Sequence, residues 1–287
     1  MTALFALATS LLWGLADFGG GLLTRRIPAL TVVVVSQVLA VLVLGTIVLA
    51  TGAGSEAGPR LWYAVGAGVV GPAAMLAFYK ALALGPMGVV SPLGSLGVVV
   101  PVSVGLLVGD RPGLLQFAGI GVAVLGVVLA GGPELRGAPV RRQAVLLTLL
   151  AAIGFGSVMA LISEASTTVT GLFLALFVQR VTNVLVGGAA LLASVGRGGR
   201  ALPEGGPAVV RAALPALAFV GLADVAANGT YAIAAQQGPV TVAAVLASLY
   251  PVVTALAARG VLKERLRAVQ AAGAGLALVG TVLLATG

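Results

Sequence analysis

The chain has 287 residues, of which 60% are hydrophobic and only 8% are charged. Soluble domains carry about a quarter of charged residues, and a soluble fold of this length could not keep so much apolar surface away from water. The composition therefore excludes an ordinary soluble globular protein, and it also excludes a disordered one, because disorder requires low hydrophobicity and high charge.

Two residue types are missing from the chain, cysteine and histidine. Their absence excludes disulfide frameworks, zinc or haem sites built on those ligands, a cysteine nucleophile and a histidine general base. We therefore expect no catalytic residues, no metal site and no cofactor. The net charge of +8 comes from basic residues scattered through short segments, and aromatic residues make up only 5% of the chain. This pattern does not favour a nucleic-acid partner, and a membrane protein with basic cytoplasmic loops explains it more simply.

The main feature of the sequence is a series of long apolar runs. A bilayer core of about 30 Å requires roughly 20 apolar residues in a helix. Ten runs meet this requirement and predict ten transmembrane helices: 2–23, 29–51, 61–84, 89–108, 114–131, 143–164, 170–195, 212–237, 240–261 and 268–286. The segments between them contain Gly, Pro and charged residues, which interrupt helices. A β-barrel does not fit, since the runs are long and do not alternate in polarity.

The two halves of the chain are related by an internal repeat. With a shift of 154 residues, 109–129 aligns with 263–283 at nine identities in 21 positions. The sequence thus predicts three parts: a first five-helix unit over 1–131, a linker over 132–142 and a second five-helix unit over 143–287. Because five is odd, the second unit enters the membrane from the opposite side. Such inverted repeats are typical of secondary transporters, whose substrate site lies near the membrane midplane.

The distribution of basic residues independently predicts the orientation. Four inter-helix segments on one face hold twelve basic residues, whereas the segments on the other face hold only Arg60 and Arg111. The positive-inside rule places the basic face in the cytoplasm, so both termini should lie outside. The first run lacks a basic segment before it and is too long for a signal peptide.

At this point the chain resembles a known family. The segment Tyr79–Pro86, the segment Val90–Arg111 with its Gly109-Asp110-Arg111 end, and the second copy, Gly238–Arg265, are similar to the drug/metabolite transporter superfamily of the EamA type. The resemblance covers essentially the whole chain. It implies an all-α integral membrane fold of ten transmembrane helices in two inverted five-helix repeats. It does not define the substrate, because the family transports amino acids, other metabolites and drugs.

Ionisable residues inside the apolar runs are the best candidates for function. Each costs roughly 2.5–3.5 kcal/mol at the centre of a bilayer, so its presence needs a reason. The predicted depths of Asp17 and Lys80 match, and so do those of Arg180 and Asp224. Two readings remain open: these are neutral pairs with a structural role, or some of them line an aqueous cavity. Glu164 is near enough to a helix end to reach water.

Further polar residues extend this candidate site. Asp224, Asn228 and Tyr231 lie on one face of the eighth run. The substrate-binding candidates are Trp13, Asp17, Gln37, Lys80, Gln179, Arg180, Asn183, Asp224, Asn228, Tyr231 and Tyr250. A buried carboxylate retains a proton more readily than an exposed one, so Asp17 and Asp224 are the candidates for proton coupling. If basic partners neutralise them, proton coupling is disfavoured.

These features predict a secondary transporter, and the chain contains no nucleotide-binding motif that would supply ATP. We expect an exporter of a small organic metabolite or drug that works by alternating access, with proton coupling as an open alternative. A flippase for a lipid-linked or amphipathic substrate is the second hypothesis. The expected partners are a small-molecule substrate and membrane lipid, without nucleic acid, and a homodimer is left open. The expected location is the cell membrane, plasma or inner, of a bacterial-like cell, as a multi-pass protein that is not an enzyme.

Overall fold

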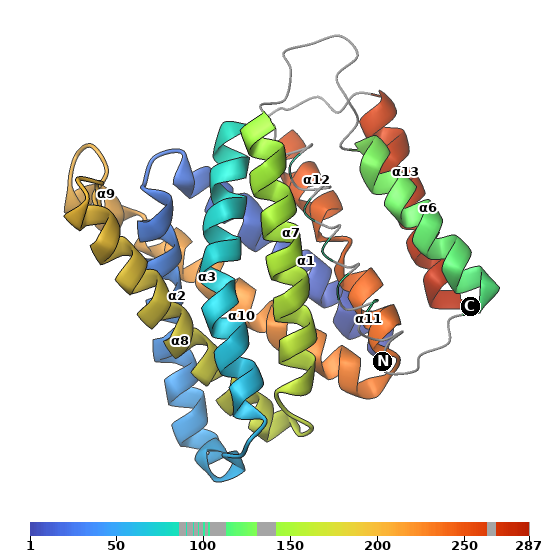
Figure 1. Cartoon of the computed structure of the whole chain (residues 1–287), viewed down its shortest axis with the longest axis horizontal. Helices are drawn as coiled ribbons and strands as arrows, with labels where there is room; N and C mark the ends of the chain where they lie inside the picture. The colour runs from blue at the N-terminus through green and yellow to red at the C-terminus, as the bar shows by residue number, and fades with distance from the viewer. Residues whose placement is uncertain are drawn as a thin grey trace.

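The computed structural model describes residues 1–85, 113–130, 142–262 and 268–286, together with the single positions 90, 94, 97, 100 and 103. All regular elements in this part of the chain are helices (Figure 1). Three predicted features lie outside the described residues, wholly or mostly: the apolar run 89–108, the linker 132–142 up to Arg142, and the basic segment Lys263–Arg267.

Within the described residues, six helices are long and apolar enough to cross a membrane. They are α1 (Thr2–Thr24), α2 (Ala29–Thr51), α3 (Leu61–Leu84), α7 (Arg142–Glu164), α8 (Val169–Gly196) and α10 (Leu214–Gln237). Their bounds lie within about two residues of the predicted runs. Long helices are expected here because a lipid environment offers no hydrogen-bond partners, so the backbone must satisfy its own polar groups.

The other described helices are all shorter than these six. They are η1 (Ala53–Glu56), α6 (Leu114–Ala130), α9 (Pro207–Ala212), α11 (Val240–Ala247), α12 (Tyr250–Leu262) and α13 (Ala268–Thr286). The prediction of ten membrane-crossing helices is therefore not confirmed by the described residues, although the all-helical character is.

One predicted helix, 240–261, is broken in the structure. It consists of α11 and α12, which are separated by a turn at Ser248 and Leu249. The cause is Pro251, which has no N–H to donate to the carbonyl of Ala247 and whose ring clashes with that carbonyl. The predicted run 212–237 also differs, because its start belongs to the separate helix α9, which has no buried residues.

The helices pack in a pattern that repeats between the two halves. Helix α3 of the first half packs on α7 of the second half, and the helix equivalent to α3, α10, packs on α1 of the first half. In addition α2 packs on α8 and α6 on α13, and in these two pairs each helix meets its own counterpart from the other half. The α6–α13 pair stands at one edge of the bundle (Figure 1). This exchange of equivalent contacts is what a pseudo-two-fold relationship between the halves requires.

Glycines allow the closest helix crossings. A Cβ atom on Gly221 of α10 would collide with the backbone carbonyl of Ser36 in α2, and one on Gly14 of α1 would collide with Val253 of α12. Small residues let membrane helices approach until their backbones touch. These two crossings fix how α1, α2, α10 and α12 surround the centre of the bundle.

Two apolar clusters occupy opposite ends of the bundle. The first cluster includes Ala6, Leu44, Ile162, Leu172 and Tyr231, which lie near the start of α1 and α8 and the end of α2, α7 and α10. The second cluster lies near the start of α2 and α10 and near the end of α3 and α12, and it includes Val32, Phe78, Leu82, Leu217 and Ala258. Trp13 packs against both clusters, so it marks the level between them.

Candidate functional site

A cavity lies between the two apolar clusters, at the level of Trp13. It encloses about 730 Å³ of empty space, including the part that is open to solvent. The polar residues of its lining are Asp17, Tyr79, Gln179, Arg180, Asn183, Asp224, Asn228, Ser248 and Tyr250. The rest of the described lining is apolar or glycine, a combination that is typical of sites for small organic molecules.

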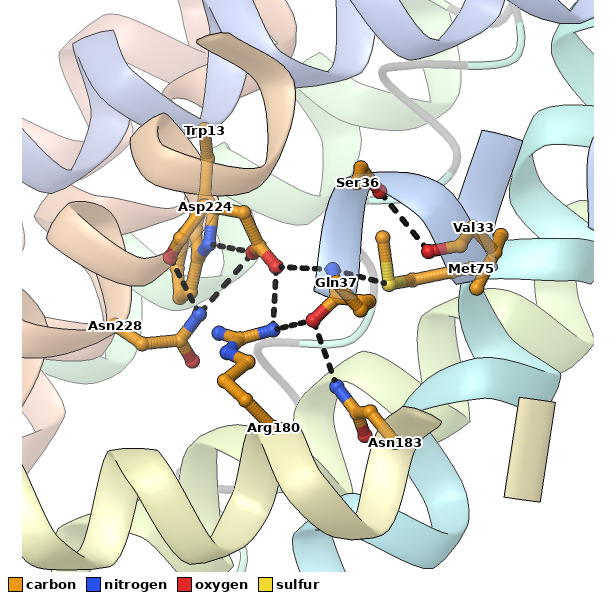
Figure 2. Close-up of polar contacts among 9 residues, drawn as sticks. All are labelled: Trp13, Val33, Ser36, Gln37, Met75, Arg180, Asn183, Asp224 and Asn228. Atoms are coloured by element: carbon orange, nitrogen blue, oxygen red, sulfur yellow. Dashed lines mark hydrogen bonds and ion pairs between the residues drawn. The ribbon is translucent and has the colours of Figure 1, made fainter. Parts of the chain in front are cut away.

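An ion pair between Arg180 and Asp224 forms the centre of this site (Figure 2). Arg180 Nη1 donates to Asp224 Oδ2 over 2.6 Å. The side chain of Arg180 is only 2% exposed and that of Asp224 16%. The equal depths of these residues in α8 and α10 predicted that they meet, and the contact confirms this. Burial of either charge alone would be costly, which explains why they are paired.

Three more side chains hold the carboxylate of Asp224 (Figure 2). Its Oδ1 accepts hydrogen bonds from Trp13 Nε1 at 3.2 Å and Asn228 Nδ2 at 3.1 Å. Its Oδ2 accepts a longer one from Gln37 Nε2 at 3.4 Å. Gln37 also accepts from Arg180 Nη1 through Oε1 at 2.8 Å. The network therefore joins α1, α2, α8 and α10, and it holds Asp224 in one position.

Asn183 connects this network to the part of α3 that precedes Pro72. Its Nδ2 donates to Gln37 Oε1 at 3.1 Å, and when the amide is turned over it donates to the carbonyl of Gly68 at 2.8 Å. Pro72 lies inside α3 and has no N–H for that carbonyl, four residues earlier. The amide of Asn183 can thus replace the missing helical donor, which gives this residue a structural role next to the cavity.

Several buried polar atoms of the site have no protein partner among the described residues. They are both amide atoms of Gln179, Nε and Nη2 of Arg180, Oδ1 of Asn228, and the hydroxyls of Tyr231 and Tyr250. Buried polar groups in proteins are nearly always hydrogen-bonded. A concentration of unpartnered groups around one cavity is therefore the arrangement expected where a polar ligand or water completes the hydrogen bonds.

The remaining candidates from the sequence differ in their placement. Asp17 lines the cavity, and no hydrogen bond or ion pair reaches it within the described part of the chain. Lys80 is exposed on α3 and does not belong to the described cavity lining, so it does not form the pair with Asp17 that their matching depths suggested. Tyr231 is fully buried and packs on Trp13, with ring centroids 6.0 Å apart. Tyr250 lines the cavity beside the break between α11 and α12.

The sequence did not reveal the apolar part of the cavity wall. Met75, Tyr79, Phe155, Val158 and Met159 line it, together with Gly71, Gly94, Gly97 and Gly156. In an apolar helix these residues give no signal that separates an inward position from a lipid-facing one. Tyr79 alone could have been found, since its hydroxyl would be costly to expose to lipid.

The fold and the site together define a multi-pass helical membrane protein with a central polar cavity. The chain belongs to the EamA-like transporter family, whose family model matches residues 1–132 and 142–286. The family match in two halves confirms the resemblance to the drug/metabolite transporter superfamily and its two-repeat architecture. The protein is accordingly a membrane transporter of this type.

The solved structures agree at the level of the fold. A crystal structure titled only "Crystal structure of protein" superposes with a TM-score of 0.69 at 18% sequence identity, covering 99% of this chain and 97% of that one. None of the curated proteins matches the chain. The comparisons therefore establish the fold and the family, and the residues of the cavity must supply the argument about its ligand.

Proposed function

We propose that the protein is a secondary active transporter that exports a small organic metabolite or drug by alternating access. The observation that carries this proposal is the position of the Arg180–Asp224 network, in a cavity between two apolar clusters. A transporter requires a central polar site that can be closed on either side. Each apolar cluster packs helix ends together on one side of that site, and separation of one cluster would open one side only.

The inverted repeat forms part of this proposal. Equivalent helices exchange contacts between the halves, as α3–α7 and α10–α1 illustrate. An odd number of helices in each half would give the halves opposite orientations, so that the first cluster could close while the second opens. We place the protein in the cell membrane, plasma or inner, with both termini outside, in accordance with the basic segments.

Transport by purified protein in sealed proteoliposomes tests the proposal. The vesicles are loaded with a panel of labelled amino acids, amines and organic acids, and release is followed with and without a pH gradient. We expect gradient-driven release of at least one solute class, and no release from vesicles that lack the protein. If no solute moves but a fluorescent phospholipid exchanges between leaflets, the flippase alternative is correct and the proposal is wrong.

A further inference from the structure

The charges that line the cavity do not balance. Among the described lining residues, Asp17 and Asp224 are acidic and Arg180 is basic. Residues 86–109 contain no charged side chain, and Lys80 is exposed outside the lining. With every group ionised, two negative charges face one positive charge. A net charge inside a membrane protein is costly, so the cavity should favour an occupant that carries one positive charge.

The two carboxylates have different surroundings. Asp224 accepts hydrogen bonds from Arg180, Trp13, Gln37 and Asn228, which use both of its oxygens. Asp17 has no partner in the described part of the chain, although it faces the same cavity. The occupant's positive charge therefore belongs beside Asp17, whereas Asp224 is held in place by its hydrogen bonds within the protein.

The groups around Asp17 do not supply that charge. From the helices packed against α1, Asp224 of α10, Tyr79 of α3 and Tyr250 of α12 interact electrostatically with Asp17. The described helices α2 and α11, which also contact α1, contain no titratable residue. The only charged group among these neighbours is Asp224, and it repels the charge of Asp17.

The remaining lining suits an organic cation. The aromatic side chains of Trp13, Tyr79, Phe155 and Tyr250 face the cavity, and aromatic rings attract ammonium groups at their faces. Gln179 adds an amide that is only 1% exposed and has no partner in the described structure. An anion could approach the free N–H groups of Arg180, but it would bring the net charge of the cavity to three negative charges against one positive.

We propose that Asp17 holds, in turn, a proton or the ammonium group of an organic amine with an aromatic or apolar body. This inference rests on the proposed function and assigns its substrate class and its coupling site. When the amine binds, the O–H bond of protonated Asp17 breaks, the proton passes to water on the open side, and the carboxylate pairs with the ammonium ion. The cavity is neutral with either occupant, whereas the empty cavity carries one negative charge. The empty protein should therefore convert slowly between the conformations that open to either side of the membrane. Exchange of the proton for the amine is then obligatory.

Binding to a single-tryptophan protein tests this inference. The chain has two tryptophans, Trp13 in the cavity and Trp62, which is 75% exposed on α3. In the Trp62→Phe background, the emission of Trp13 reports on occupancy. The probes are phenethylammonium, phenethyl alcohol and phenylacetate, which share one aromatic body and carry charges of about +1, 0 and −1 at neutral pH.

We expect phenethylammonium to bind at least about tenfold more tightly than phenethyl alcohol, because an unbalanced carboxylate attracts it, and phenylacetate to bind most weakly. Cation binding should release protons into a weakly buffered solution and should weaken as the pH falls, because protons compete for Asp17. Asp17→Asn should remove both the preference and the proton release. Asp17→Glu should keep the preference, and Glu164→Gln, an exposed carboxylate at a helix end, should change neither.

Equal or tighter binding of phenylacetate would overturn the inference, and so would an unchanged preference in Asp17→Asn. If Asp17→Asn does not fold, a loss of the preference in Asp17→Glu would also overturn it. The proposed function has a separate readout in the proteoliposomes. Release of neutral or anionic solutes without cation binding would leave the transporter intact and remove only this inference, whereas cation binding without any transport would refute the proposed function.

Discussion

Two ion pairs in this protein have the same chemistry in different surroundings. Arg180 and Asp224 are buried in the centre of the bundle, whereas Arg60 and Glu164 meet at 3.4 Å with side chains 54% and 57% exposed. Water screens the second pair, so its contribution should be small. The first pair is screened much less, and loss of one partner leaves a buried charge without compensation.

Asp224→Asn should therefore destabilise the protein by about 3–5 kcal/mol. The substitution keeps the shape of the side chain but removes the charge that balances Arg180. The melting temperature in detergent measures this loss. The double variant Asp224→Asn with Arg180→Gln should recover much of the stability, since neither charge remains. If the double variant is as unstable as the single one, the pair does not act through charge compensation.

Glu164→Gln is the matched test of the exposed pair. We expect its stability to change by less than about 1 kcal/mol, because both side chains of the pair are solvated. Arg60 also donates to the backbone carbonyl of Glu164 at 3.0 Å, a contact that the substitution leaves in place. A loss comparable to that of Asp224→Asn in the same melting experiment would contradict this assignment.

At this scale the sequence predicted charged residues better than aromatic or apolar ones. A charge in an apolar run stands out because of its cost, and matching depths brought Arg180 and Asp224 together correctly. The same reasoning failed for Lys80, because depth along a helix does not specify which side of the helix faces inward. One position separates exposed Lys80 from Tyr79, whose side chain lines the cavity.

At the scale of helices, the crossing of α10 over α2 determines where Asp224 and Gln37 meet. A Cβ atom on Gly221 would collide with the carbonyl of Ser36 at this crossing. Ser36 directly precedes Gln37, and Gly221 lies three residues before Asp224. Apolar length predicted both helices, but their crossing depends on a glycine that looks like any other of the 42 in the chain. The break between α11 and α12 was missed for a related reason, since proline occurs in unbroken membrane helices as well, as Pro72 does in α3.

Gly221→Ala should push α10 away from α2, because its Cβ would collide with backbone that cannot rotate aside. We expect a loss of about 1–3 kcal/mol together with weaker cation binding, since Gln37 and Asp224 would separate. Gly188→Ala on α8 is the control, because a Cβ there meets nothing within 4 Å. The control should be neutral or slightly stabilising, owing to the higher helix propensity of alanine. Equal melting temperatures for the two variants would show that the crossing has room for a methyl group.

At the scale of the whole molecule, the number of membrane crossings and the orientation are linked. Both terminal helices, α1 and α13, have their chain ends toward the lower side of the bundle in Figure 1. Two termini on one face require an even number of crossings, and the asymmetry of basic residues predicts that this face lies outside. The hydrophobic pattern predicts the number of crossings without any knowledge of packing, because each apolar run is read by itself, and the total of ten stays a prediction. The contacts between the halves could not be predicted in this way.

The absence of cysteine from the chain allows a direct test of this topology. A single cysteine at Ser55, an exposed residue of η1, should react with a membrane-impermeant maleimide in intact cells. A single cysteine at Glu204, which is exposed before α9, should react only after the cells are opened. The positive-inside rule predicts this difference, since the segment around Glu204 carries Arg197, Arg200 and Arg211, whereas the segment around Ser55 carries Arg60 alone. Both positions are exposed, so a lack of reaction cannot come from burial within the protein. Labelling of both cysteines in intact cells would contradict the five crossings predicted between them, because an odd number places the two residues on opposite faces, and the reverse pattern would place the first apolar cluster on the cytoplasmic side.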